Sequence, residues 1–186
     1  HVEYGYSCMG YEIAGALGAK MADPGREVFA LVGDGSYLMM SAELVTAVSE
    51  GIKLIVVIVQ NHGFASIGAL SETVGSQRFG TSYRFRNPGT GLLDGDKLPV
   101  DLAANAESLG ADVLRATTID ELRTALEQAK ASPRTTVVHI ETDPLAPVPS
   151  PESWWDVPVS AVAALESTRK ARAEYEAAKA AQRPYL

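Results

Sequence analysis

The chain has 186 residues, of which 46% are hydrophobic and 21% charged, and it carries a formal net charge of −7 with a pI near 5.0. This length suits one globular domain with a substantial core, the acidic balance argues against a nucleic-acid-binding face, and no apolar run approaches the roughly 18 residues of a membrane-spanning helix. The single cysteine, Cys8, excludes an internal disulfide and favours a reducing, cytoplasmic location.

The chain opens with HVEYGYSCMG, which contains neither an initiator methionine nor a signal-peptide pattern. We therefore expect it to be a piece of a longer protein. Residues 11–22 are rich in small side chains and place Ile13, Leu17 and Met21 one helical turn apart, which predicts a buried helix packed close to its neighbours.

Residues 28–61 predict a βαβ unit. Residues 28–32 form its first strand, and a helix follows for which we take Ser41 as the cap and Gly51 as the end. Residues 53–61, KLIVVIVQN, are apolar on both faces, which is typical of a parallel strand covered by helices on both sides.

Residues 64–100 are rich in Gly, Ser, Thr and charge, and they predict a long irregular segment with one short helix near 66–72. Regular patterns then return. We predict a helix capped by Asp101, a strand at 111–116, a helix that begins with a Thr118–Glu121 capping box and a strand at 135–141. An exposed helix is predicted within 160–182, where a Glu166–Lys170 pair supports it. The sum predicts an α/β fold, a doubly wound and mostly parallel sheet with helices on both faces, over residues 1–143. A C-terminal arm with a helix, residues 144–186, completes the chain.

Polar loops follow the first two predicted strands. Ligands bind beyond the carboxyl ends of the strands in open α/β sheets, so the loops 33–36 (GDGS) and 60–63 (QNHG) can converge on one site. Dinucleotide binding fails on detail, because Leu38 occupies the third glycine position of that motif and a bare Asp34 would repel a pyrophosphate. A divalent cation between the carboxylate and a phosphate removes this objection.

Hard oxygen ligands for such a cation are available in these loops. Asp34 offers a carboxylate, Asn61 an amide oxygen and Gly63 a backbone carbonyl, a set that suits Mg²⁺ or Ca²⁺ together with phosphate oxygens. Backbone N–H groups of Gly35 and Ser36 would bind the phosphates. The alternative interpretation is plain turn chemistry, since Asp and Asn are common in turns.

These loops resemble a known motif. GDGS followed by N-x-G is similar to the diphosphate-and-metal motif of thiamine-diphosphate enzymes, and SCMGYEIAGALGAKMA resembles the segment before it in acetolactate synthase and pyruvate decarboxylase relatives. The sequence of residues 1–48 and the segments YRFRNPGTGLLDG and ESWWDVPV resemble the hydrolases that open 3D-(3,5/4)-trihydroxycyclohexane-1,2-dione in inositol catabolism.

The resemblance implies thiamine diphosphate and Mg²⁺ as cofactors and a cyclic dione as the substrate, opened to 5-deoxy-glucuronate by C–C cleavage and hydrolysis. It makes Met9 the apolar prop beneath the folded cofactor, and Asp34, Asn61 and the Gly63 carbonyl the metal ligands. It assigns cofactor contacts to Ser7, Cys8, Met9, Gly33, Asp34, Gly35, Ser36, Asn61, Gly63 and Phe64.

One part of the family's site has no counterpart in this chain. The family's catalytic glutamate comes from an N-terminal pyrimidine-binding domain, usually of the neighbouring subunit, and neither Glu3 nor Glu12 fits that pattern. The resemblance therefore implies a partner domain, on the same chain or another subunit, and a homodimer or homotetramer. We expect the chain alone to hold the diphosphate half of a site and to show no turnover.

Several residues keep two interpretations. Met9 is a cofactor prop or core filler, Met39 and Met40 are expected in the core, and Cys8 is expected to be a small buried thiol. The remaining candidates contact ligand or partner, or have an ordinary structural role: His1, His62, Arg78, Arg84, Arg86, Trp154 and Trp155. His139 lies in a predicted strand and is expected to be a satisfied core or edge histidine.

Two other functions stay open. One is a carboligase or decarboxylase of the same superfamily, such as acetolactate synthase. The other is a non-catalytic regulatory domain that binds a nucleotide or a metal ion. Binding of thiamine diphosphate in the presence of Mg²⁺, with ADP as a failed competitor, would separate the second from an enzyme.

Overall fold

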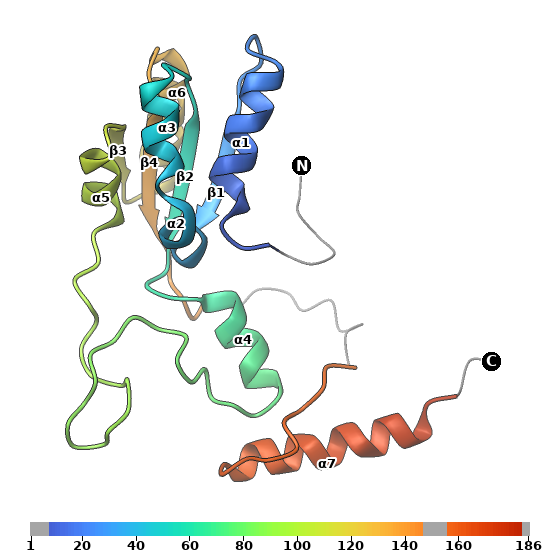
Figure 1. Ribbon diagram of the computed structural model, residues 1–186. Coiled ribbons are helices and arrows are strands. Elements are labelled where there is room, and N and C mark those ends of the chain that lie inside the picture. The colour runs from blue at the N-terminus through green and yellow to red at the C-terminus, as the bar shows by residue number, and fades with distance from the viewer. Residues whose placement is uncertain (1–7, 147–155, 184–186) are drawn as a thin grey trace. The chain divides into compact units, whose positions relative to one another are not determined.

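Four parallel strands form one sheet in a computed structural model that describes residues 8–146 and 156–183 (Figure 1). Their order in the sheet is β1-β2-β4-β3, with bounds β1 Phe29–Gly33, β2 Ile55–Gln60, β3 Asp112–Ala116 and β4 Thr136–Glu141. Because β2 lies between β1 and β4, the residues that end these three strands share one edge. The register pairs Gln60 with Glu141 at that edge.

One face of the sheet is covered by α1 (Tyr11–Ala22), α2 (Asp34–Met40), α3 (Glu43–Ser49) and α5 (Leu102–Ser108). Alternate strand residues meet these helices because successive side chains of a strand point to opposite faces. The buried cluster here includes Ile13, Leu17, Val32, Tyr37, Leu44, Val56, Ile58, Leu102, Ala106 and Val137.

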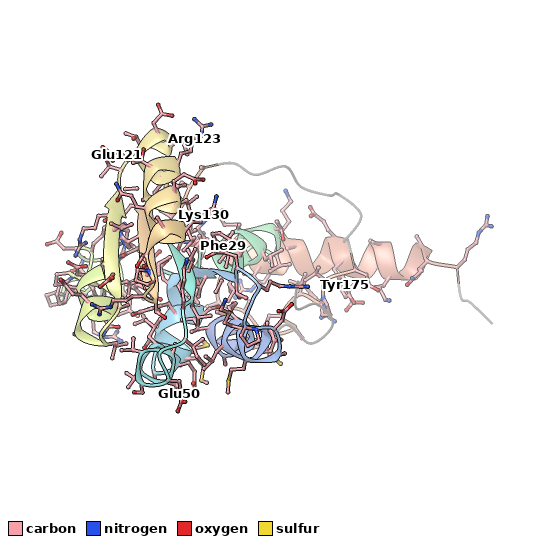
Figure 2. All side chains as sticks on the ribbon, turned by 90° about the horizontal axis from the view of Figure 1, so that it is seen from above. Phe29, Glu50, Glu121, Arg123, Lys130 and Tyr175 are labelled. Atoms are coloured by element: carbon pink, nitrogen blue, oxygen red, sulfur yellow. The ribbon has the colours of Figure 1, made fainter. Side chains whose placement is uncertain are left out.

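The other face is covered by α6 (Ile119–Ala131). Ala125 and Ala129 let this helix approach Ile55 and Val138 closely, and Leu114, Leu122 and Leu126 surround the contact. Figure 2 shows α6, with Glu121, Arg123 and Lys130, on the opposite side of the sheet from Glu50 at the end of α3. The predicted doubly wound α/β fold with helices on both faces is therefore confirmed.

The described residues leave part of that second face open at β1. Phe29 and Leu31 are 42% and 69% exposed, whereas Ala30 and Val32 on the other side of the same strand are buried. The strand is apolar on both faces, but α6 covers β2, β4 and β3 rather than β1.

Helix ends in the second half follow the predicted local signals. The Asp101 carboxylate accepts a hydrogen bond from Ala104 N at 2.9 Å and caps α5, and Gly110 follows that helix with a φ of +94°. Thr118 Oγ1 accepts from Glu121 N at 3.2 Å and caps α6. The Glu121 carboxylate reaches back to Thr117 N at 2.7 Å, one residue earlier than the usual capping box.

The prediction that Ser41 caps the first helix after β1 is wrong. Helix α2 begins at Asp34, directly after the extended Gly33, and Ser41 lies in helical conformation between α2 and α3. The helix starts this early because the buried Asp34 side chain is held by backbone N–H groups of the next loop, a tertiary contact that local capping rules do not consider.

Four sulfur-containing side chains predicted to be buried are exposed instead. Met21 is 59% exposed because α1 turns only Ile13, Ala16 and Leu17 into the core. Met39 and Met40, predicted in the core, are 53% and 39% exposed at the end of α2. Cys8, predicted to be buried, is exposed in the turn that precedes α1.

A second compact unit contains residues 64–97 and the described part of 145–186, while residues 8–63 and 98–144 belong to the first. Its helices are α4 (Ala65–Thr73), which confirms the short helix predicted near 66–72, and α7 (Glu166–Ala181). The domain limits predicted at 143 and 144 stay a prediction, and residues 64–97, which that prediction placed in the first domain, group here with the C-terminal segment.

Helix α7 is exposed along most of its length, as predicted for the C-terminal arm, and it is anchored at its first turn. The hydroxyls of Ser167 and Thr168 both donate to the Gly75 carbonyl, at 2.7 and 2.8 Å, and Thr168 is buried. The predicted Glu166–Lys170 pair is wrong in detail, because Glu166 pairs with Arg169 and Lys170 with Glu174.

Candidate functional site

The Asp34 carboxylate joins the loops that follow β1 and β2. Its Oδ1 accepts a hydrogen bond from Asn61 N at 2.8 Å, and its Oδ2 accepts from His62 N at 2.7 Å and from Gly63 N at 3.3 Å. The side chain is 1% exposed. The two loops therefore meet at the carboxyl edge of the sheet, where a parallel α/β fold binds ligands.

The amide oxygen of Asn61 has an unusual environment. Asn61 Oδ1 is buried and accepts no hydrogen bond from the part of the chain that the structure describes, although a buried polar atom without a partner costs about 1–3 kcal/mol. Asp34 Oδ1 accepts a single hydrogen bond in the structure and keeps a second lone pair. Two oxygen atoms of adjoining loops thus retain capacity for a further electropositive partner.

Backbone geometry explains how three N–H groups reach one carboxylate. His62 has a φ of +60°, in the left-handed region that costs a non-glycine residue on the order of 1 kcal/mol. Successive N–H groups around such a residue point into one concavity, which binds an anion. The anion that occupies this concavity is the carboxylate of Asp34.

The His62 side chain lies largely covered, at 15% exposure, rather than in solvent. Its Nδ1 is 3.3 Å from Gln60 Nε2, and its Nε2 is 3.0 Å from Glu141 Oε2. Since the Gln60 amide can only donate to Nδ1, the imidazole proton lies on Nε2 and is donated to Glu141. The ring is therefore held from both of its nitrogens.

Gln60 is fully buried, and both the nitrogen and the oxygen of its side-chain amide have partners. Besides His62, its Nε2 donates to the Val100 carbonyl at 2.9 Å, and its Oε1 accepts from His139 Nε2 at 2.7 Å. This set of partners fixes the orientation of the amide, because a carbonyl oxygen in place of Nε2 could not donate to Val100 O. His139 is thereby confirmed as a buried strand histidine with a partner.

Burial is the largest influence on His139. Desolvation lowers its pKa below the ordinary value of 6.5, and the nearby Arg115 guanidinium lowers it further. The carboxylates of Glu141, Asp101 and Asp34 act in the opposite direction but do not reverse the shift. A neutral imidazole suits its place as a donor to Gln60.

The start of α2 is held rigidly against the core. Gly35 and Ser36 are buried next to Asp34, and the fully buried Tyr37 donates its hydroxyl to Asn105 Oδ1 on α5 at 2.9 Å. Burial raises the pKa of Tyr37 to about 12, so this hydroxyl remains a proton donor at physiological pH. Helices α2 and α5 are thereby fastened together beside the polar edge.

The segment before α1 reaches the same region through Gly10. A β-carbon on Gly10 would lie 2.8 Å from Met40 Cγ and 3.2 Å from Met39 Cβ. Gly10 also has a φ of +93°, so both the close packing and the backbone conformation require glycine here. The neighbouring Met9, the predicted cofactor prop, is 41% exposed beside α2. Ser7, also a predicted cofactor contact, lies outside the described residues, as do His1, Trp154 and Trp155.

Phe64 and the three arginines of interest belong to the second unit. Phe64 packs edge-on against Tyr83, with 5.7 Å between ring centroids. Arg78 pairs with Glu72 at 2.7 Å, and Arg84 and Arg86 donate to the carbonyls of Gly95 and Gly91. These contacts hold the loop, in agreement with the structural alternative given for the arginines.

The described residues contain no cluster of three His, Cys, Asp or Glu side chains that could hold a metal ion by themselves. The edge instead combines one carboxylate, one amide oxygen and backbone groups, a set that needs further oxygen atoms from a ligand to complete an octahedral shell.

A family model matches most of the chain. The model described as "Thiamine pyrophosphate enzyme, C-terminal TPP binding domain" matches residues 1–140. The chain belongs to this family of thiamine pyrophosphate enzymes. The predicted resemblance to thiamine-diphosphate enzymes is therefore confirmed.

Two relatives of this chain are named as the trihydroxycyclohexanedione hydrolases that its sequence was predicted to resemble. The chain is 44% identical over 171 residues to 3D-(3,5/4)-trihydroxycyclohexane-1,2-dione hydrolase 2 of Bacillus cereus, covering 92% of this chain and 27% of the relative. It is 43% identical over 176 residues to the hydrolase of that name from Bacillus thuringiensis (strain Al Hakam), covering 95% and 27%. The chain thus spans about a quarter of the length of these relatives.

A solved structure supports the fold. The thiamine diphosphate-dependent 4-hydroxybenzoylformate decarboxylase of Rhodococcus jostii RHA1 has a TM-score of 0.59 and 25% identity, covering 73% of this chain and 23% of that one.

Among the described residues of this thiamine-pyrophosphate-binding domain, no helix is both long and apolar enough to cross a membrane.

The sequence did not point to Glu141 or to the links among Gln60, His62 and His139. A usable signal was present, because the strand predicted at 135–141 ends on a glutamate and must end at the same sheet edge as 53–61 if the two are parallel. What the sequence does not give is the strand order, which makes β4 rather than β3 the neighbour of β2.

Proposed function

We propose that this thiamine-pyrophosphate-binding domain serves a Mg²⁺-dependent enzyme that opens 3D-(3,5/4)-trihydroxycyclohexane-1,2-dione to 5-deoxy-glucuronate by hydrolysis of a C–C bond, as part of inositol catabolism. The names of relatives 43–44% identical to this chain support the substrate and the reaction class. Since the chain spans 27% of those relatives, the proposal assigns it the diphosphate and metal half of the site.

A single observation carries the proposal. The Asp34 carboxylate accepts hydrogen bonds from the backbone of the Asn61–Gly63 turn, and Asn61 Oδ1 is buried without a hydrogen-bond partner among the described residues. In water or in an ordinary turn an amide oxygen would have a donor. A divalent cation supplies the missing positive partner, and oxygen ligands of this kind are those that Mg²⁺ selects.

The residues then have distinct roles. Asp34 and Asn61 would hold Mg²⁺ through their side-chain oxygens, and Gly63 through its backbone carbonyl. Backbone N–H groups of Gly35 and Ser36, which start α2 after Gly33, would bind the diphosphate. Thiamine diphosphate supplies, when bound, the carbon nucleophile and electron sink that C–C cleavage requires.

The remaining cofactor contacts follow the family pattern. Met9 would support the folded cofactor as an apolar prop, and Ser7, Cys8 and Phe64 are the further cofactor contacts that the family pattern implies. The glutamate that the family's chemistry needs would come from a pyrimidine-binding domain outside this chain, within a homodimer or homotetramer in the cytoplasm. The exposed Met9, Met39 and Met40 are compatible with such a partner domain.

Replacing Asn61 gives the sharpest test of the metal site. Asn61→Ala removes an oxygen that has no partner in the structure, while the backbone N–H that binds Asp34 stays in place. We expect the variant to keep its stability in urea and to lose at least about tenfold in Mg²⁺-dependent affinity for thiamine diphosphate, measured by titration calorimetry.

Asn87→Ala is the matched control, because Asn87 is a loop asparagine whose Oδ1 already has a hydrogen-bond donor, Gly89 N at 2.9 Å. It should bind as tightly as the parent chain, and ADP with Mg²⁺ should fail to compete. Equal affinity of the Asn61→Ala and parent chains would contradict the metal assignment. Competition by ADP would favour a nucleotide-binding regulatory domain instead.

A carboligase or decarboxylase of the same superfamily is the second candidate, because a structural neighbour of this fold is a thiamine diphosphate-dependent decarboxylase. A substrate panel separates the two candidates once the domain that supplies the glutamate is present. Release of CO₂ from 2-oxo acids, with no consumption of the cyclic dione, would replace the hydrolase proposal with this one.

A further inference from the structure

We propose that Gln60, His62 and Glu141 position the ligands of the proposed cation by clamping the turn that presents them. This inference rests on the proposed function, because it concerns the aim of Asn61 and Gly63 toward the same Mg²⁺. The three side chains are positioning residues: each acts through the Asn61–Gly63 backbone rather than on cofactor or substrate.

The need for a clamp arises from the backbone of His62. A φ of +60° is unfavourable for a residue with a β-carbon, and such strain persists only where surrounding contacts determine the conformation. His62 stands between the two residues proposed to offer ligand oxygens. Relaxation of its backbone would therefore turn both Asn61 Oδ1 and the Gly63 carbonyl away from a common point.

The clamp has one partner on each side of the imidazole. Glu141 Oε2 accepts from Nε2 at 3.0 Å, and the Gln60 amide donates to Nδ1 at 3.3 Å. Gln60 and Glu141 end the neighbouring strands β2 and β4 and pair with each other in register. The position of the imidazole ring is therefore fixed by the ends of two paired strands.

Gln60 can hold the His62 ring in place because its own side chain is held by further buried hydrogen bonds. Its amide also reaches the Val100 carbonyl and His139, at 2.9 and 2.7 Å, and the side chain is 1% exposed. Such partners orient metal ligands in many proteins, and their loss typically weakens metal affinity about 10–100-fold. Since Glu141 is 63% exposed, we place its effect at the lower end of that range.

Variants at Glu141 distinguish a hydrogen bond from a simple charge effect. Glu141→Ala and Glu141→Gln both remove the negative charge, but the glutamine retains an oxygen that accepts the His62 N–H. With Mn²⁺ as the probe and thiamine diphosphate present, electron paramagnetic resonance of the 186-residue chain should show Mn²⁺ affinity about tenfold weaker for Glu141→Ala and within about twofold of the parent for Glu141→Gln.

Variants at His62 separate the side chain from the backbone. Glycine tolerates a positive φ better than histidine does, so His62→Gly relieves the strain while removing both clamp contacts. We expect Mn²⁺ affinity to fall about tenfold in this variant. Without any cation present, amide hydrogen exchange at residues 61–63 should also become about tenfold faster, as the N–H bonds to Asp34 open more often.

A matched control lies at the amino ends of β1 and β2. Glu27→Ala removes a 2.8 Å ion pair between Glu27, which precedes β1, and Lys53, which precedes β2. This variant should leave both Mn²⁺ affinity and amide exchange at residues 61–63 unchanged. Asp34→Ala, which removes a proposed ligand, should abolish Mn²⁺ binding.

The outcomes separate this inference from the function on which it rests. Parent-like Mn²⁺ affinity in His62→Gly, equal losses in the two Glu141 variants, or a similar loss in Glu27→Ala would each overturn the clamp and leave the metal site standing. Absence of Mn²⁺ binding by the parent chain would overturn both. Weakening confined to His62→Gly and Glu141→Ala, with faster local exchange, would establish the positioning role.

Discussion

At the scale of single residues, the chemistry of this edge depends on groups that are buried and few in number. Asp34 uses its carboxylate to gather three backbone N–H groups, so it has a structural task as well as the proposed ligand role. Asp34→Ala should therefore destabilise the fold as well as remove a proposed ligand. Three donors would lose their acceptor, and each unsatisfied buried group costs about 1–3 kcal/mol.

His139 should give the domain a pH-dependent stability. Its pKa is lowered by burial and by Arg115 in the folded chain, whereas in the unfolded chain it is near 6.5. Below pH 6.5 the unfolded chain therefore binds more protons than the folded chain, and this contribution to the free energy of unfolding falls as the pH drops toward the folded pKa. Above the ordinary pKa it is fully present.

Urea unfolding at a series of pH values between about 5 and 8 measures this contribution. His139→Gln removes the titrating group, so its free energy of unfolding should depend less on pH below 6.5 than that of the parent. Identical slopes for the two chains in that window would show that burial of His139 does not determine the pH dependence.

At the scale of elements, local sequence signals decide where some helices begin and fail for others. Asp101 and Thr118 cap α5 and α6 as their patterns predict, because a cap involves only the residues of the next turn. The start of α2 at Asp34 was missed, because it depends on N–H donors from the loop after β2. Helix α7 was predicted as a helix, but its anchor on Gly75 joins distant segments.

The cap of α5 can be tested directly. Asp101 accepts from Ala104 N and pairs with Arg115 at 2.9 Å, and the Ala104 hydrogen bond is the main reason its pKa lies below the ordinary value. Asp101→Ala should lower the free energy of unfolding in urea by about 1 kcal/mol. Asp120→Ala, which removes an exposed ion pair with Arg123, should change it by less than about 0.5 kcal/mol.

At the scale of the whole molecule, the chain presents one side of a proposed site. The described residues bring Asp34, Asn61 and Gly63 together, yet apolar side chains at the same region and on β1 remain exposed. Met9, Met39 and Met40 on one side and Phe29 and Leu31 on β1 are not covered by the described part of the chain. Apolar area of this kind is typical of surfaces that bind another protein or domain.

We therefore expect the purified 186-residue chain to bind thiamine diphosphate with Mg²⁺ but not to hydrolyse the cyclic dione. Consumption of the dione by the chain alone, followed by absorbance or by chromatography of the product, would contradict the half-site proposal. The control for contaminating activity is the Asn61→Ala chain, purified in the same way.

The sequence by itself determined the fold class, most helix and strand positions and the two loops of the proposed site. Those features depend on local patterns: apolar runs in 28–32 and 53–61, caps at Asp101 and Thr118, and GDGS and N-x-G at strand ends. Only the tertiary structure decided the strand order, the unpaired Asn61 oxygen, the left-handed His62 and its clamp by Gln60 and Glu141. These features depend on which strands are neighbours, and residues 27 to 79 positions apart meet there, so no local pattern could reveal them.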